Sequence, residues 1–187
     1  DEVQPGFGRT GDFMWGFQRH GVRPDLVTMG KPMGNGYPVA GLAARSELLA
    51  EFGRRTRYFN TFGGNSTAIA AAQAVWDVIH DEGLLRNAME VGSYLKEGLS
   101  EISSECLGEV RGAGLFIGVD IHRNGAPWPE GCAKIVNRLR EKNVLISATG
   151  KLGTTLKIRP PLIFTKEHAD LFLDTLSAVV GEVAHDA

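Results

Sequence analysis

The 187-residue sequence has little of what marks several large classes of protein. Its two cysteines, Cys106 and Cys132, are too few for a disulfide framework and lack the spacing of a metal site. A formal net charge of −2 gives no basic excess that would favour nucleic acid or an anionic membrane as a partner. No uninterrupted apolar run reaches the length of a membrane span. We therefore expect a cytoplasmic globular protein with free buried thiols and with no metal, nucleic-acid or membrane partner.

An initiator methionine is also missing, since the chain begins with Asp1-Glu2-Val3-Gln4. We expect this sequence to be a piece of a longer protein. Its length suits one large domain or two small ones, and 43% hydrophobic residues are enough to bury a core.

Glycine and proline crowd around one lysine in residues 28–38, Thr-Met-Gly-Lys-Pro-Met-Gly-Asn-Gly-Tyr-Pro. The apolar run 26–29 predicts a buried strand that ends just before Lys31. Pro32 disfavours a helical Lys31, so we expect an extended conformation there. A lysine at the tip of a buried strand can be desolvated, which lowers its pKa and makes its amine the nucleophile that Schiff-base chemistry needs. The alternative is a lysine at a strand end that reaches into water.

Hydrophobic periodicity predicts alternating helices and strands. The expected helices cover 12–20, 46–52, a segment that Ser66 caps, a second long segment after Gly83, 132–142, and a segment that Thr165 caps. Strands are expected at 26–29, 39–44, 115–121, 144–147 and 155–158. The order of elements in the second half, strand, helix, strand, strand and helix, indicates a small α+β domain.

The segment Gly6-Phe7-Gly8-Arg9-Thr10-Gly11 matches G-x-G-x-x-G, the fingerprint of dinucleotide-binding proteins. That fingerprint requires an apolar strand before it and a helix directly after it. Asp-Glu-Val-Gln-Pro is not such a strand, so we interpret the match as a loop.

The amine of Lys31 could form a Schiff base with a cofactor that carries a carbonyl group. The commonest cofactor bound to lysine in this way is pyridoxal 5′-phosphate. This cofactor needs a carboxylate at its pyridine nitrogen, donors for its phosphate and a cation for the substrate carboxylate. Asp1, Thr61 and Arg159 are the candidates. None of the five histidines has a partner at metal-ligand spacing, and no nucleophilic serine or cysteine arrangement is evident.

Several segments follow one another in the order of a known family's motifs: residues 1–4, 6–11, 24–25, the lysine loop, Thr61-Phe62-Gly63-Gly64-Asn65, Val110-Arg111-Gly112-Ala113-Gly114-Leu115 and Arg159-Pro160-Pro161-Leu162. Together they closely resemble the class III (ω-type) pyridoxal-phosphate-dependent aminotransferases, over essentially the whole chain. The resemblance implies an α/β protein of fold type I. Residues 1–90 would be the C-terminal part of the large, cofactor-binding domain, and residues 91–187 the small α+β C-terminal domain.

The resemblance also implies a role for each matched residue. Lys31 would form the Schiff base and shuttle the proton, and Asp1 would pair with the pyridinium nitrogen. Val3 would pack on the cofactor ring and Gln4 would hydrogen-bond near its phenolic oxygen. Thr61 would reach the phosphate across the interface of a homodimer or higher homo-oligomer.

Arg159 would clamp a substrate carboxylate through its bidentate guanidinium, a geometry that lysine cannot offer. The implied activity is transfer of an amino group from an amine or amino acid to a 2-oxo acid. Members of the family are roughly twice this length, so we expect the isolated chain to bind the cofactor poorly and the activity to belong to the parent protein. The same motifs also resemble phospho-lyases that act on phosphoethanolamine-type amines. A non-catalytic remnant of the fold is the third interpretation.

Overall fold

The computed structural model describes residues 1–185, which form two compact units. The first unit is Asp1–Leu85 and the second begins at Arg86. Among the described residues, no helix is long and apolar enough to cross a membrane, and no cluster of His, Cys, Asp and Glu side chains could hold a metal ion.

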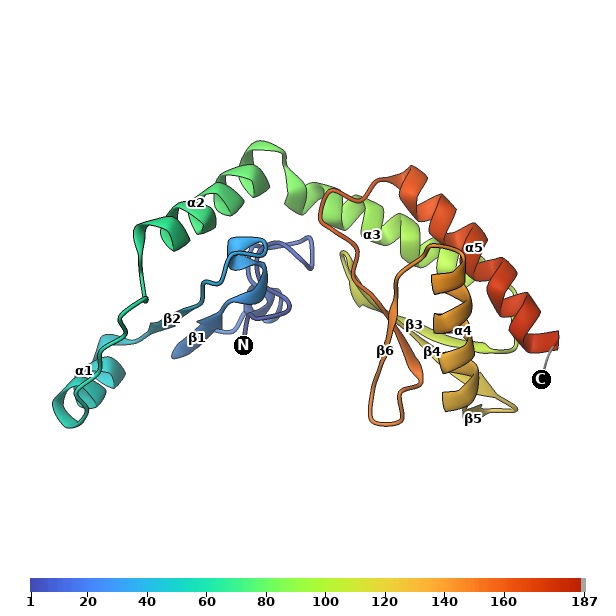
Figure 1. The fold of residues 1–187 in the computed structure, drawn as a ribbon, viewed down its shortest axis with the longest axis horizontal. Coiled ribbons are helices and arrows are strands. Elements are labelled where there is room, and N and C mark those ends of the chain that lie inside the picture. Colours follow the sequence, from blue (N-terminus) through green and yellow to red (C-terminus); the bar gives the residue numbers. More distant parts are fainter. Residues whose placement is uncertain (186–187) are drawn as a thin grey trace. The chain divides into compact units, whose positions relative to one another are not determined.

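The first unit combines helices of different lengths with a small antiparallel sheet (Figure 1). Its elements are η1 (Gly16–His20), β1 (Leu26–Met29), η2 (Lys31–Gly34), β2 (Gly41–Ala44), α1 (Ser46–Arg55) and α2 (Ser66–Asp81). Strands β1 and β2 pair with Leu26 opposite Ala44 and Met29 opposite Gly41. The Gly6–Gly11 segment consists of turns, as expected for a loop.

The predicted burial of the strands beside the lysine is wrong. Leu26 is 52% exposed and Leu42 is 56% exposed. A sheet of only two strands has open edges and cannot cover both of its faces, so its side chains stay accessible.

The predicted helix over residues 12–20 is present only as the 3₁₀-helix η1. It begins later because the Glu2 carboxylate accepts from the first amides of η1, those of Gly16 and Phe17. Asp12, the first residue of the predicted helix, forms an ion pair with Arg19 instead of capping it. Likewise α2 is capped by the Asn65 side chain, which accepts from the Ala68 amide at 2.9 Å, and not by Ser66.

The second unit is an antiparallel sheet with helices packed against one face (Figure 1). Its strands lie in the order β3-β4-β7-β6, with short β5 beside β4. Its elements are α3 (Leu84–Glu101, of which Leu84 and Leu85 belong to the first unit), β3 (Leu107–Ala113), β4 (Phe116–Arg123), β5 (Ala126–Pro127), α4 (Pro129–Glu141), β6 (Ser147–Thr149), β7 (Thr155–Ile158) and α5 (Lys166–His185).

Alternation along the strands builds the core of the second unit. Every second residue of β4 is buried, namely Ile117, Val119 and Ile121, and Leu156 and Ile158 of β7 join them. The helical stripes that the sequence predicted complete this core: Leu95 and Leu99 of α3, and Ala169, Phe172, Leu176, Val179 and Val183 of α5. Burying one large aliphatic side chain contributes about 1.5–3 kcal/mol, so this core dominates the stability of the unit. Both cysteines are free and buried, as predicted.

Boundaries in the second unit differ from the prediction at several elements. The strand expected at 144–147 begins at Ser147, and β3 was not expected as a strand at all. Helix α4 starts at Pro129 rather than at Cys132, since proline suits the first turn of a helix, where its missing N–H costs nothing. Strand β7 and helix α5 lie where the sequence placed them.

Candidate functional site

Lys31 occupies a tight turn directly after β1. The Met33 amide donates to the Gly30 carbonyl at 3.1 Å, which closes the turn around the lysine. Lys31 has φ of 48°, in the left-handed region that side chains with a Cβ enter only at a cost. The predicted extended conformation is therefore wrong. Pro32 disfavours the right-handed region for its predecessor, and closing the turn leaves the left-handed one. The lysine side chain is exposed.

Asp1 lies beside the strand that leads to this turn. Its Oδ1 accepts from the Val3 amide at 2.9 Å and from the Thr28 hydroxyl at 3.3 Å. The Glu2 amide donates to the Thr28 carbonyl at 2.8 Å, so residues 1–3 run alongside β1. The Asp1 carboxylate therefore lies beside β1, and the Lys31 amine belongs to the turn that follows this strand. Val3 is half-buried and Gln4 is exposed.

The buried Glu2 side chain fixes the segment that carries the Asp1 carboxylate, and the sequence analysis did not identify Glu2. Only 2% of Glu2 is exposed, and its side-chain oxygens accept from Gly16 N at 2.7 Å and Phe17 N at 3.0 Å. Charged hydrogen bonds of this kind are about twice as strong as neutral ones. Glu2 therefore anchors residues 1–3 between η1 and β1. No local sequence pattern announces this contact, because its partners lie 14 and 15 positions away along the chain.

Thr61 belongs to an exposed loop that two asparagine side chains brace. The Asn60 carboxamide accepts from Phe62 N at 3.3 Å and Gly63 N at 3.0 Å. Asn65 donates to the Phe62 carbonyl at 2.8 Å while it caps α2. The loop presents Thr61 together with Phe59 and Phe62, which are 84% and 82% exposed.

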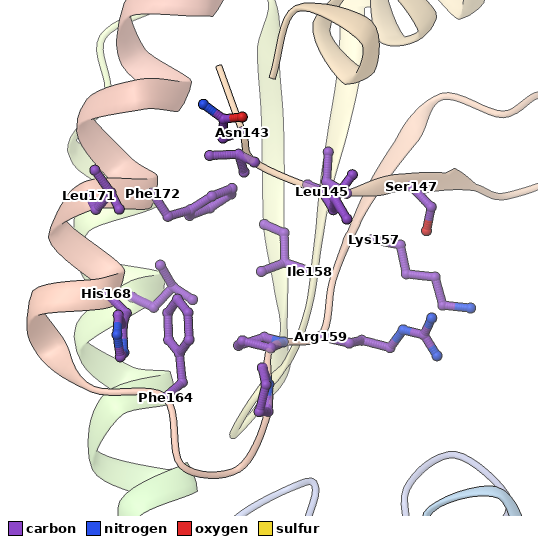
Figure 2. A pocket seen from close by; sticks show the side chains of 15 residues that line it. Asn143, Leu145, Ser147, Lys157, Ile158, Arg159, Phe164, His168, Leu171 and Phe172 are labelled. Atoms are coloured by element: carbon purple, nitrogen blue, oxygen red, sulfur yellow. The ribbon is translucent and has the colours of Figure 1, made fainter. Parts of the chain in front are cut away.

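Arg159 follows β7 in the second unit and lines a cavity of about 490 Å³ (Figure 2). Apolar side chains from α3, α5 and the strands form one wall, among them Leu95, Ile158 and Phe172. Arg159 itself is exposed, and Figure 2 shows its guanidinium directed away from that apolar wall. The cavity is therefore apolar on one side and cationic on the other.

A polar network holds the sheet face on which Arg159 lies. Arg111 of β3 makes a bidentate ion pair with Asp120 of β4, and the Thr155 hydroxyl of β7 donates to Asp120 at 2.6 Å. The Arg111 hydrogen bond holds the pKa of the Asp120 carboxyl below its usual value, against the opposing effect of burial, with further help from Thr155. This network ties three neighbouring strands together.

Two of the groups that the sequence assigns to a cofactor lie on neighbouring segments of the first unit. Lys31 supplies a primary amine and Asp1 a carboxylate that is already oriented by Val3 and Thr28. Thr61 lies on a different loop of the same unit, and Arg159 lies in the second unit. The structure thus brings Asp1 and Val3 together next to the lysine strand, while the roles assigned to these residues stay predictions.

A family model and the most similar curated proteins point to the same family of proteins. Residues 1–180 match the family model described as Aminotransferase class-III. A mitochondrial alanine–glyoxylate aminotransferase 2 homolog from Arabidopsis thaliana is 44% identical over 181 residues, which is 94% of this chain and 38% of the plant protein. An ethanolamine-phosphate phospho-lyase homolog from Caenorhabditis elegans is 40% identical over 187 residues, covering 96% and 39%.

Among solved structures, a phospholyase from Arthrobacter in complex with phosphoethanolamine matches with a TM-score of 0.93 and 46% identity. The match covers 97% of this chain and 44% of that one. The chain therefore has the α/β architecture of part of a fold type I aminotransferase, and it spans well under half the length of the relatives that it matches.

Proposed function

The chain belongs to the class-III aminotransferase family, and we propose that it is the C-terminal part of an enzyme that uses pyridoxal 5′-phosphate. The parent protein would transfer an amino group from an amine or amino acid to a 2-oxo acid. The observation that carries this proposal is Lys31. It stands in a strained left-handed turn just past β1, with the Asp1 carboxylate held against the same strand. Strained backbone of this kind gathers at functional sites.

The side chains of this chain would each do a separate task. Lys31 would hold the cofactor covalently through Nζ and, once released, accept the substrate Cα proton and return it. Asp1 would keep the pyridine nitrogen protonated, with Val3 N and Thr28 Oγ1 fixing its carboxylate. The cofactor, when bound, supplies an electron sink that stabilises negative charge at the substrate Cα.

The remaining residues would bind and orient. Val3 would pack against the ring, Gln4 would donate near its phenolic oxygen, and Thr61 would bind the phosphate from the partner subunit of a homodimer or higher oligomer. Arg159 would bind the substrate carboxylate as a planar fork. Because the chain spans 38–39% of these relatives, we assign turnover to the parent protein and not to this chain alone.

A second candidate is elimination of phosphate from a phosphoethanolamine-type amine. The similarity to the Arthrobacter phospholyase, at 46% identity, favours it as much as the plant relative favours transamination. Arg159 suits a phosphate as well as a carboxylate. A non-catalytic remnant is disfavoured because Lys31 and Asp1 survive together with the turn that positions them.

The compartment is part of the same proposal. Free buried thiols suit the reducing cytoplasm, whereas the Arabidopsis relative is named mitochondrial. The cytoplasm is therefore the proposed compartment, with the mitochondrion of the plant relative as the alternative.

The test uses the parent protein with pyridoxal phosphate and amines that carry either a carboxylate or a phosphate. Amino transfer that needs a 2-oxo acid and disappears in Lys31→Ala, but not in the surface control Lys134→Ala, supports transamination. Release of inorganic phosphate without any oxo acid would assign the lyase reaction instead. If the parent protein binds the cofactor but shows neither amino transfer nor phosphate release, both candidate functions are contradicted.

A further inference from the structure

The segment 159–165 joins β7 to α5 and begins with Arg159 (Figure 2). Arg159 directly follows Ile158, the buried last residue of β7, so the sheet fixes the chain on that side of the arginine. On the other side Pro160 and Pro161 come next. Each proline ring fixes its own φ at about −65° and restricts the backbone of the residue before it. Few free torsions therefore separate Arg159 from the turn that follows, and whatever holds this turn also directs the backbone at Arg159.

Asn87 of α3 holds that turn through its side chain. The Phe164 amide closes the turn by donating to the Pro161 carbonyl at 3.0 Å. Asn87 Nδ2 donates to the Leu162 carbonyl at 2.6 Å and to the Phe164 carbonyl at 3.0 Å. Only the NH₂ end of a carboxamide can donate, and its two protons match the two carbonyl acceptors. One half-buried side chain therefore ties two positions of the turn to α3.

Apolar contacts hold the same turn against the same part of α3. Leu162 and Phe164 pack against the cluster of buried residues to which Ala88 and Val91 of α3 belong. Asn87 and Val91 are four residues apart, so they lie on one face of the helix. Apolar packing has no preferred direction, whereas hydrogen bonds do. The packing therefore keeps the turn on the helix, and the Asn87 carboxamide fixes its orientation.

We propose that Asn87 is a positioning residue for Arg159, and that it sets the direction of the guanidinium that binds the acidic group of the substrate. The inference rests on the proposed function, because that function assigns substrate binding to Arg159. Asn87 acts through the loop and not by contact with the substrate. Without its two hydrogen bonds, β7 and the core stay in place while the chain after Arg159 can rotate. A small rotation there displaces the guanidinium, because it lies at the end of a long side chain, and substrate binding weakens.

The first test is steady-state kinetics of the parent protein with phosphoethanolamine and with 4-aminobutyrate, an amine that carries a carboxylate. Asn87→Ala should raise KM about fivefold for each of the two that the protein converts, with kcat within about twofold. Asn87→Asp keeps the shape of the side chain but cannot donate when ionised, so it should raise KM at least as much. The matched control is Tyr94→Phe, which removes a hydrogen bond from α3 to Asp170 of α5 and should leave KM within about twofold.

A double-mutant cycle separates positioning from a purely structural role. Arg159→Ala should raise KM more than Asn87→Ala does. In the Arg159→Ala background, Asn87→Ala should change KM by less than about twofold, because no guanidinium is left to position. An equal rise in KM from Asn87→Ala in both backgrounds would overturn the proposal, and so would an equal rise in Tyr94→Phe.

Hydrogen exchange of the parent protein gives a readout that needs no turnover. The Phe164 amide should exchange at least about tenfold faster in Asn87→Ala, while the amides of β4 keep their rates. Unchanged exchange at Phe164 would contradict the inference. If Arg159→Ala leaves KM unchanged, the role of Arg159 in the proposed function fails and the inference fails with it. If Arg159→Ala raises KM and Asn87→Ala does not, the inference fails alone.

Discussion

At the scale of single residues, Lys31 is held in a conformation that opposes stability. Its φ of 48° costs a residue with a Cβ about 1–2 kcal/mol relative to the right-handed region, a cost that glycine largely avoids. The turn that imposes this angle is closed by the Gly30–Met33 hydrogen bond. The turn therefore holds Lys31 in an unfavourable backbone conformation at the position that carries the proposed nucleophilic amine.

Replacing Lys31 with glycine should therefore stabilise the chain relative to alanine at the same position. We expect the free energy of unfolding of Lys31→Gly to exceed that of Lys31→Ala by about 1 kcal/mol, after the entropy that glycine loses on folding. Urea denaturation of both variants measures the difference. A more stable alanine variant would mean that the left-handed turn is not maintained in solution.

The Arg111–Asp120 pair predicts a pH dependence of stability. The folded pKa of Asp120 lies below its usual value, so its stabilisation is present above about pH 4 and is lost as the pH falls through the folded pKa. Asp120→Asn should cost at most about 1 kcal/mol at pH 7, as for a partly exposed pair.

The same variant should flatten the stability curve between pH 7 and pH 3, as followed by urea denaturation. Some slope will remain, because the hydrogen bond from Thr165 and the backbone also lower the pKa of Glu167. A variant curve as steep as that of the unmodified chain would contradict the assignment.

Cys132 should be chemically silent in the folded chain. Burial raises the pKa of its thiol to about 11, and none of the residue is exposed. At pH 8 only about one thiol in a thousand would be ionised, and the thiolate is the reactive form. Iodoacetamide should label it only after denaturation, as measured by mass spectrometry with Cys132→Ala as the control. Rapid labelling of the native chain would show that α4 opens.

At the scale of elements, long amphipathic segments were predictable and short ones were not. Helices α3 and α5 follow from stripes repeated over several turns, and β7 from a short alternation of polar and apolar residues. Strand β3 was missed because Glu109, Arg111 and Gly112 break its apolar pattern, and pairing with β4 decides its structure.

Two helical glycines should respond to alanine in opposite directions. A Cβ at Gly92 of α3 would lie 2.3 Å from the Gly114 carbonyl oxygen, whereas a Cβ at Gly181 of α5 meets nothing within 4 Å. Gly92→Ala should destabilise the chain by about 1–3 kcal/mol through overpacking against backbone.

Gly181→Ala should stabilise it by about 0.5–1 kcal/mol, because alanine is the better helix former. Thermal denaturation of both variants, each compared with the unmodified chain, is the measurement. An unchanged stability of Gly92→Ala would show that α3 does not approach the β3–β4 turn as closely as described, and destabilisation by Gly181→Ala would show that α5 has no open space at this position.

At the scale of the whole molecule, the two units differ in how much core they bury. The large cluster of buried hydrophobic residues lies in the second unit. The first unit leaves many apolar side chains exposed, among them Leu26, Leu42, Phe59 and Phe62. This is what a part of a larger domain would show, in line with the chain's coverage of its relatives.

Hydrogen exchange should reveal the difference in the isolated chain. We expect amides of β1 and β2 to exchange at least a hundredfold faster than those of β4 and α5, because local opening costs little where few apolar contacts are lost. In the parent protein β1 and β2 should become protected. Equal protection of both units in the isolated chain would show that the first unit is stable alone.

The domain division predicted from the sequence, 1–90 and 91–187, stays a prediction beside the structural division after Leu85. The roles of Lys31 and Asp1 stay predictions that rest on the local motifs in which these residues stand. The sequence could not predict how they are held, because Glu2 and Thr28 act on them through contacts between distant segments.

The central claim is that Lys31 holds the cofactor, and the most direct measurement is borohydride reduction of the parent protein with pyridoxal phosphate, followed by peptide mass spectrometry. We predict a single stable label on Lys31, which disappears in Lys31→Ala and persists in Lys134→Ala. A label on another lysine, or one that survives in Lys31→Ala, would contradict the claim.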